Sequence, residues 1–170
     1  MTIKLMGAIL IIAGCSGFGL TIVKNHRYEV RTLRQLCTIL DYISCELQYH
    51  LTPLPEMCRR VSNISHGCLQ NTFSNLAVEL ENQISPNVAH CMDAVLRKNE
   101  KLPPLTVKCL KLLGKSLGHF DVEGQIKGLE SVHTECRRLL ETCSENQSVR
   151  LRSYQTLALC AGAAMAILFV

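Results

Sequence analysis

The chain has apolar segments at both ends and amphipathic segments between them. Residues 5–23, LMGAILIIAGCSGFGLTIV, contain no charged side chain. A helix of that length extends roughly 28 Å at ~1.5 Å per residue, which is close to the thickness of the hydrocarbon core of a bilayer. Residues 157–170, LALCAGAAMAILFV, are also uncharged, and with 154–156 they approach the minimum span of roughly 17 residues. We therefore predict membrane helices at 1–23 and 154–170.

The middle of the chain, 24–153, repeats apolar residues at intervals of three and four, the period of a helix with one buried face. The clearest stripe consists of Leu33, Leu36, Leu40, Ile43 and Leu47. The pattern predicts helices over 28–51, from 53 to about 64, over 69–83, from 86 to about 98, over 106–117 and from 122 onward. No segment alternates as a strand does. The prediction is an all-α fold, a six-helix bundle flanked by N-terminal and C-terminal membrane helices.

Capping and turn residues mark the boundaries of these helices. Thr52 and Ser85 each precede a proline, so we predict that they are the N-caps of the second and fourth helices. Residues 99–104, NEKLPP, form the clearest loop. Gly118 suits the left-handed position after the fifth helix, and Asp121 suits the N-cap of the sixth.

Basic residues predict the side of the membrane on which the middle of the chain lies. Only Lys4 precedes the first apolar segment. Four basic residues follow that segment and two precede the second: Lys24, Arg27, Arg31, Arg34, Arg150 and Arg152. Because basic flanks stay on the cytoplasmic side, we predict that 24–153 is a cytosolic domain held at the cell membrane by both ends.

An alternative interpretation places the protein outside the cytoplasm. The sequence IAGC at Ile12–Cys15 resembles a bacterial lipoprotein processing site, and cleavage there would leave a lipid-anchored extracytoplasmic helical protein beginning at Cys15. Two features oppose this reading. The apolar run continues past Cys15, and the remaining cysteines would face an oxidising space that favours disulfides. From the sequence alone both interpretations stay open.

The ten cysteines favour a reducing compartment. None forms a C-x-x-C pair, and most occupy positions where the helical pattern places a small apolar residue. We interpret them as reduced thiols of the core. The alternative is a metal site made by His66, Cys68, His90 and Cys91, whose spacing is unspecific. We predict no metal and no cofactor.

Residues 112–125, LLGKSLGHFDVEGQ, contain a short match to a phosphate-binding loop. The GKS at 114–116 would end such a loop, but the glycine that the motif requires five positions earlier is replaced by Cys109, and the preceding residues have a helical pattern. His119 and Gln125 flank the predicted turn, yet no nucleophile–base pair or carboxylate pair lies at local spacing. We therefore predict that the protein is not an enzyme.

The charged and aromatic residues do not indicate a nucleic-acid partner. The net charge of +4 is small, no basic run is dense, and Trp is absent. The pairs Arg59-Arg60 and Arg97-Lys98 are typical of a solvated surface, with docking to an acidic partner as the alternative. His133, on an apolar stripe, is typical of a hydrogen-bonded core histidine.

Four glycines surround the predicted turn between the fifth and sixth helices. Gly114 and Gly118 lie four residues apart at the end of one helix, and Gly124 and Gly128 lie four apart at the start of the next. We predict that these glycines let the two helices approach closely as an antiparallel hairpin. Ser116 is then expected to point away from the contact between the two helices.

Four short motifs occur in order along the chain: KLMGAILIIAG at the start, LRQL at Leu33–Leu36, TPL at Thr52–Leu54 and LGKSLGHFDVEGQ at Leu113–Gln125. With the apolar C-terminus after Tyr154, this arrangement resembles the stage III sporulation protein AB family of endospore-forming bacteria. The last motif matches the family pattern L-G-x-x-L-G-x-x-D-x-x-x-Q at Leu113, Gly114, Leu117, Gly118, Asp121 and Gln125. A tryptophan often seen in the fourth helix of the family is absent, and Cys91 stands in that region.

The resemblance implies a function that the residues alone do not show. It implies a non-enzymatic, membrane-anchored subunit of a secretion-like channel assembly between mother cell and forespore. The helical domain would be similar to the cytoplasmic domain of type II secretion and type IV pilus platform proteins. The protein would lie in the mother-cell membrane around the forespore and contact a companion ATPase and other channel subunits. Self-association into a homo-oligomer is a further expectation that stays open. The six motif residues are expected to form a structural hairpin first and a contact surface second.

Overall fold

The computed structural model describes the backbone of residues 2–49, 52–82, 87–99, 101–118 and 123–144, and the side chains among them from residue 24 onward. Within those ranges all regular structure is helical, which confirms the all-α fold class. The chain divides into two compact units. One comprises Met1–Val30 with Thr142–Val170, and the other comprises Arg31–Glu141. The second unit contains the bundle.

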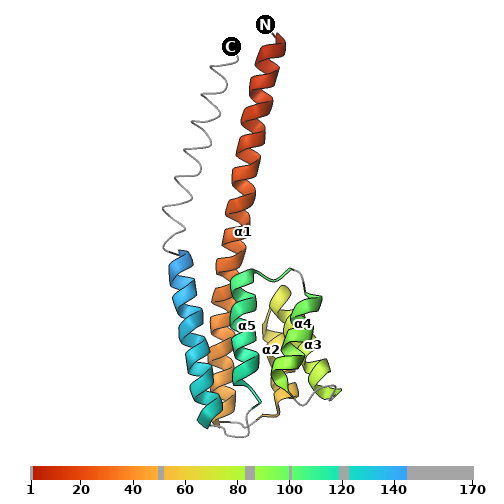
Figure 1. The fold of residues 1–170 in the computed structure, drawn as a ribbon, viewed down its shortest axis with the longest axis vertical. Coiled ribbons are helices and arrows are strands. Elements are labelled where there is room, and N and C mark those ends of the chain that lie inside the picture. Colours follow the sequence, from red (N-terminus) through yellow and green to blue (C-terminus); the bar gives the residue numbers. More distant parts are fainter. Residues whose placement is uncertain (1, 50–51, 83–86, 100, 119–122, 145–170) are drawn as a thin grey trace. The chain divides into compact units, whose positions relative to one another are not determined.

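The first helix, α1 (Thr2–Tyr49), is one continuous element (Figure 1). The sequence predicted two separate segments, 5–23 and 28–51, whereas the structure joins them into one helix. The reason is local, because the residues between the two segments include neither glycine nor proline and nothing there ends a helix.

Among the residues whose side chains the structure describes, from residue 24 onward, no helix combines the length and the apolar character that crossing a membrane requires. The second predicted membrane helix, 154–170, lies outside the described residues.

Four shorter helices and one longer helix complete the bundle. They are α2 (Leu54–Ile64), α3 (Cys68–Glu81), α4 (Val88–Lys98), α5 (Pro104–Ser116) and a helix over 123–144. The contacts run in chain order, α2 on α3, α3 on α4 and α4 on α5 (Figure 1). Short connections between antiparallel helices produce such neighbours.

The predicted apolar stripes form the core. Leu33, Leu36, Leu40, Ile43 and Leu47 on α1 are all buried, as are Leu69, Phe73 and Leu76 on α3 and Val88, Cys91, Met92 and Val95 on α4. Leu80 on α3 and Leu140 on the helix over 123–144 are only half-buried. The helix over 123–144 buries Leu129, Val132 and Cys136.

Both predicted N-caps are wrong. The N-cap of α2 is Pro53, without a side-chain hydrogen bond, and Thr52 Oγ1 instead donates to Glu46 Oε2 at 2.6 Å. Glu46 is 7% exposed, and a buried carboxylate is costly unless it is hydrogen-bonded. The N-cap of α4 is Asn87 rather than Ser85, since Asn87 Oδ1 accepts from Ala89 N at 2.9 Å.

The end of α5 agrees with the prediction. Leu117 is the C-cap, and Gly118 follows it with φ +88°, a left-handed backbone that glycine adopts without a steric penalty. The predicted N-cap of the next helix, Asp121, lies outside the described residues.

Candidate functional site

The predicted motif residues lie mainly inside the bundle. Leu113, Gly114 and Leu117 are buried at the end of α5, and Gln125 is 9% exposed at the start of the helix over 123–144. Gly118 is exposed at the turn after α5. The sixth motif position, Asp121, is outside the described residues. Four of the five described motif residues are thus buried.

Two of the motif glycines allow α5 to approach α4. A Cβ on Gly114 would lie 2.8 Å from Met92 Cβ, and one on Gly118 would lie 2.5 Å from Val88 Cγ2. Both distances are shorter than real side chains tolerate, so any larger residue must displace α4. The contact between α4 and α5 therefore depends on both glycines.

The glycine partners differ from the sequence prediction. Gly114 and Gly118 face α4 instead of the helix over 123–144, and only Gly128 contributes to the predicted hairpin. A Cβ on Gly128 would lie 3.0 Å from Ser116 Cβ. Ser116 therefore points toward Gly128 and not away from it, and its hydroxyl donates to Leu112 O at 3.0 Å. The GKS sequence is thus part of a helix–helix contact.

Three thiols from distant parts of the sequence meet in the core. Cys37 on α1, Cys109 on α5 and Cys136 on the helix over 123–144 are 8%, 0% and 0% exposed. Cys136 and Cys37 are hydrogen-bonded with their Sγ atoms 3.3 Å apart, and Cys136 Sγ also lies 3.7 Å from Leu33 O. Cys109 forms a further hydrogen bond with Cys136. We call these residues the thiol trio.

The trio differs from the other buried thiols in its electrostatics. The hydrogen bond with Cys136 lowers the pKa of Cys37 and of Cys109, although burial opposes the shift. The pKa of Cys136 is raised by the same two hydrogen bonds and by burial. Burial alone raises the pKa of the Cys58 thiol to about 12. Cys58 is therefore an unreactive reference for the trio.

The residues of the alternative metal site do not come together as a ligand set. His66 and His90 are exposed, while Cys68 and Cys91 are buried. Among the residues whose side chains are described, no group of three or more His, Cys, Asp or Glu is arranged to hold a metal ion.

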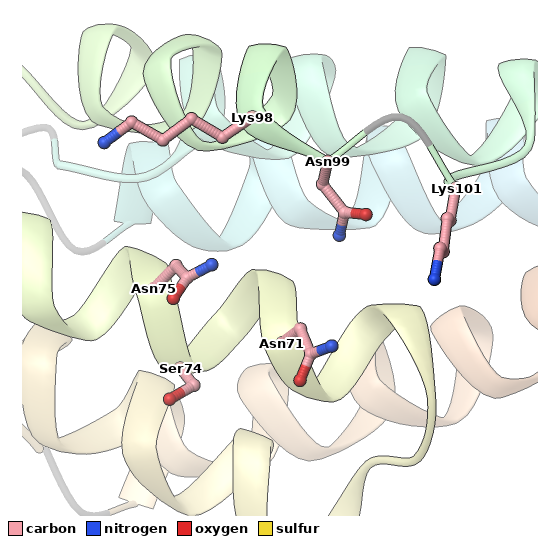
Figure 2. Close-up of a pocket in the computed structure, with 6 residues that line it drawn as sticks. All are labelled: Asn71, Ser74, Asn75, Lys98, Asn99 and Lys101. Atoms are coloured by element: carbon pink, nitrogen blue, oxygen red, sulfur yellow. The ribbon is translucent and has the colours of Figure 1, made fainter.

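A polar hollow of about 440 Å³ lies between α3 and the end of α4 (Figure 2). Asn71, Ser74 and Asn75 come from α3, and Lys98, Asn99 and Lys101 face them from the end of α4 and the following loop. The sequence analysis identified the loop but not the hollow. Its side chains come from segments more than twenty residues apart, so no local motif indicated it.

Two residues of the hollow are held by neighbouring groups. Lys98 Nζ pairs with Glu79 Oε1 at 2.8 Å. Asn99 Nδ2 donates to Thr72 Oγ1 at 3.0 Å and to Cys68 O at 3.3 Å. Among the lining residues that the structure describes there is no histidine or carboxylate, so none of them can act as a general base toward the Ser74 hydroxyl.

Three of the four basic residues singled out in the sequence form ion pairs within the bundle. Arg59 pairs with Glu81, and Lys98 pairs with Glu79. Arg60 pairs with both Glu56 at 2.7 Å and Glu46 at 3.5 Å. Because these charges are partly neutralised on their own surface, they favour the solvated-surface interpretation over docking to an acidic partner.

The histidines do not form a catalytic arrangement with the groups that the structure describes. His133 Nε2 lies 3.1 Å from Asp41 Oδ1, close enough for an ion pair when the ring is protonated, but without the geometry of a hydrogen bond. The predicted hydrogen-bonded core histidine is thus a half-buried residue beside a carboxylate. His119 lies outside the described residues.

Comparisons with known proteins indicate a family. A family model described as stage III sporulation protein AB matches residues 4–170. A solved structure titled "Stage III sporulation protein AB (SpoIIIAB)" is 22% identical, covers 72% of this chain and 98% of its own, and superposes with a TM-score of 0.64. That structure supports the fold. A search of curated protein sequences found no match.

Proposed function

The chain belongs to the stage III sporulation protein AB family, and on that basis we propose that it is a non-enzymatic, membrane-anchored subunit of a secretion-like assembly. Family membership supports a role in sporulation. The proposal adds that the protein acts as a platform or adaptor for a companion ATPase, together with other channel subunits. The observation that carries it is the family match, which extends across residues 4–170 and includes both apolar ends.

Two features of the sequence support membrane attachment. Residues 5–23 contain no charge and belong to α1, and the four basic residues Lys24, Arg27, Arg31 and Arg34 follow them on the same helix. At 100° per residue these four side chains fall within one narrow arc of the helix. A basic stripe after an apolar segment favours the cytoplasmic side, which supports a bundle that faces the cytoplasm. The proposed membrane, the mother-cell membrane around the forespore, rests on the family assignment.

The packing of the bundle supports an adaptor role. The motif that matches the family pattern lies where α5 packs against its neighbours, and its residues Leu113 and Gly114 are buried there. The described residues that line the polar hollow are amides, lysines and one serine. If a partner ATPase supplies the chemistry, this chain needs only a rigid surface to which the ATPase can bind. A tightly packed helical bundle provides a rigid surface.

Cysteine labelling in intact sporulating cells tests the orientation. The structure favours Cys45 as the reporter because its side chain is exposed, whereas Cys58 and Cys68 are buried. Single-cysteine variants that retain Cys45 are treated with a membrane-impermeant thiol reagent before and after permeabilisation. Protection until permeabilisation is expected for a cytosolic bundle, and a variant that retains only Cys58 should stay unlabelled in both conditions.

Labelling of Cys45 in intact cells would contradict the proposed orientation. Mass spectrometry of the N-terminus then decides whether a lipidated Cys15 is present, as the lipoprotein alternative requires.

The adaptor role is tested separately, by passing the companion ATPase over the full-length protein in detergent. We expect retention of the ATPase and not of an unrelated hexameric ATPase. A folded, correctly oriented protein that retains neither would remove the adaptor role and leave the family assignment intact.

A further inference from the structure

We infer that Cys37 and Cys136 are an oxidation site, at which a hydroperoxide converts the two thiols into a disulfide that ties α1 to the helix over 123–144. The two Sγ atoms are already 3.3 Å apart and lie in the same compact unit. A disulfide bond is about 2.05 Å long, so the sulfurs must approach by about 1.3 Å. Rotation of two cysteine side chains covers such a distance.

Cys37 is the residue that reacts first with the oxidant. It is 8% exposed, whereas Cys109 and Cys136 are fully buried. The Cys37 thiol donates to Cys136 Sγ, and the Cys136 thiol donates to Leu33 O at 3.7 Å. The contact with Cys136 also lowers the pKa of Cys37, which favours the thiolate that attacks the oxidant. Cys37 is thus the nucleophile, and the more deeply buried Cys136 is the resolving thiol.

The reaction proceeds in two balanced steps. The Cys37 thiolate attacks one oxygen of hydrogen peroxide, the O–O bond breaks, and Cys37 becomes a sulfenic acid while hydroxide leaves and takes up the proton that Cys37 released. The Cys136 sulfur then attacks the sulfenic sulfur, and the S–O bond breaks as water leaves with the Cys136 proton. Two thiols lose two electrons and two protons, and one peroxide becomes two waters.

The remaining cysteines provide internal comparisons. Cys109 also contacts Cys136 but has no exposed surface, so it competes as the partner of Cys136 without a path for the oxidant. Cys45 is the exposed thiol of the same helix as Cys37. Cys58 is as buried as the trio, and burial raises its pKa to about 12.

The disulfide would join residues that are 99 positions apart in the sequence. Such a crosslink restricts the unfolded chain, so the oxidised protein should unfold at a higher temperature than the reduced one. In a reducing cytosol the thiols stay free, and oxidation would convert the bundle into a more rigid form.

The test uses the reduced full-length protein in detergent, exposed to brief pulses of hydrogen peroxide and then alkylated. Mass spectrometry of the digest identifies linked peptides. We expect the Cys37–Cys136 link to be the main product and to form at least about tenfold faster in the folded protein than in urea, because folding holds the two sulfurs together. Cys58→Ser should not change this result.

Two further variants test the roles of the residues. Cys136→Ala removes the resolving thiol, so Cys37 should accumulate as a sulfenic acid that dimedone traps. Cys45→Ser removes the exposed thiol and should leave the Cys37–Cys136 link intact. The inference is overturned if links that involve Cys45 or Cys109 predominate in the folded protein. It is also overturned if urea leaves the rate of the Cys37–Cys136 link unchanged, a result that does not depend on any variant folding.

Discussion

At the scale of single residues, the buried polar groups of the bundle differ in whether they have hydrogen-bond partners. The Glu46 carboxylate is 7% exposed and accepts from Tyr42 Oη at 2.8 Å and from Thr52 Oγ1 at 2.6 Å. Arg60 lies 3.5 Å from the same carboxylate. By contrast, Thr106 Oγ1 is fully buried on α5 and makes no hydrogen bond. A paired buried group is nearly neutral in free energy, whereas an unpaired one is a net cost.

Thr106→Val should therefore stabilise the protein. Valine has the shape of threonine and the same stiff χ1, so the substitution removes the unpaired hydroxyl without changing helix packing. We expect a gain of about 1 kcal/mol in the free energy of unfolding, seen as an increase in the thermal midpoint by circular dichroism.

Thr72 provides a matched control for this substitution. It is equally buried, but its hydroxyl donates to Cys68 O at 2.8 Å and accepts from Asn99 Nδ2 at 3.0 Å. Thr72→Val should destabilise the protein by about 1 kcal/mol, because the half-buried Asn99 amide loses one of its two acceptors. Equal changes in the two variants would show that the hydroxyl of Thr106 has a partner.

At the scale of helices, glycine decides which elements can touch. The α4–α5 contact has Gly114 against Met92 and Gly118 against Val88, and the contact of α5 with the helix over 123–144 has Gly128 against Ser116. At each of these positions the missing Cβ is what lets the helices pack so closely. A helix propensity scale treats these glycines only as defects, so their role appears only in the packed structure.

Gly118→Ala should be more destabilising than Gly67→Ala. Both glycines have a positive φ, +88° and +67°, and both substitutions therefore introduce backbone strain of roughly 1–2 kcal/mol. Only Gly118 faces a neighbour, Val88 Cγ2, at 2.5 Å from the new Cβ, whereas nothing lies within 4 Å of a Cβ on Gly67. We expect a loss of roughly 2–4 kcal/mol for Gly118→Ala, measured by thermal unfolding.

A second substitution separates the strain from the contact. In a Val88→Ala background the added methyl group has space, so Gly118→Ala should cost about as much as Gly67→Ala does in the original protein. If the difference between the two glycines persists in that background, Val88 is not its cause.

At the scale of the whole molecule, ion pairs determine how stability depends on pH. Most of them are on the surface and contribute little individually. Glu135 is different because it bonds to two cations at once: Arg138 Nε and Nη2 at 2.8 and 2.9 Å, and Lys108 Nζ at 2.8 Å. These hydrogen bonds, that of Arg138 first, lower the pKa of Glu135 to about 2. The Lys108–Glu135 ion pair also links α5 to the helix over 123–144.

Glu135→Gln should flatten the acid side of the stability profile. The pKa of Glu135 is lower in the folded state than in the unfolded state, where it is about 4.3. Its contribution is therefore present above about pH 4.3 and is lost as the pH falls toward about 2. We expect the thermal midpoint of the variant to fall less steeply than that of the original protein across this window, at low ionic strength.

Glu123→Gln is the control for this measurement. Glu123 pairs with Lys127 at 2.9 Å within one helix, and the two side chains are 77% and 73% exposed. Its variant should follow the original protein across the acid window. A Glu135 variant that also follows it would show that the double ion pair does not contribute to folding.

Helical periodicity predicted the elements well, and the helix ends less well. The stripe from Leu33 to Leu47 identified the buried face of α1, and Gly118 identified the end of α5, because period and backbone chirality act locally. Thr52 was expected to cap α2, but it bonds to Glu46, six residues earlier. The Thr52 hydroxyl could accept from a backbone N–H at the start of α2 or donate to the Glu46 carboxylate, and the sequence does not indicate that this carboxylate is buried beside it.

The candidate site was only partly predictable. The sequence identified the motif glycines and the thiols as packing residues, and the structure buries Gly114, Cys37, Cys109 and Cys136. It did not indicate that the three thiols meet, since the spacing from Cys37 to Cys136 follows no metal or redox motif. Nor did it indicate the polar hollow between α3 and α4. Both features come from segments that only packing brings together.

The sequence by itself determined the helical class, the uncharged segment 5–23, the basic stripe after it and the resemblance to a sporulation family, because each depends on the order of residues along the chain. The tertiary structure decided which helix each glycine faces, which cysteines touch and which buried hydroxyl lacks a partner. Such properties depend on distances between residues far apart in the sequence. Those distances are set when apolar stripes from different helices are buried against one another.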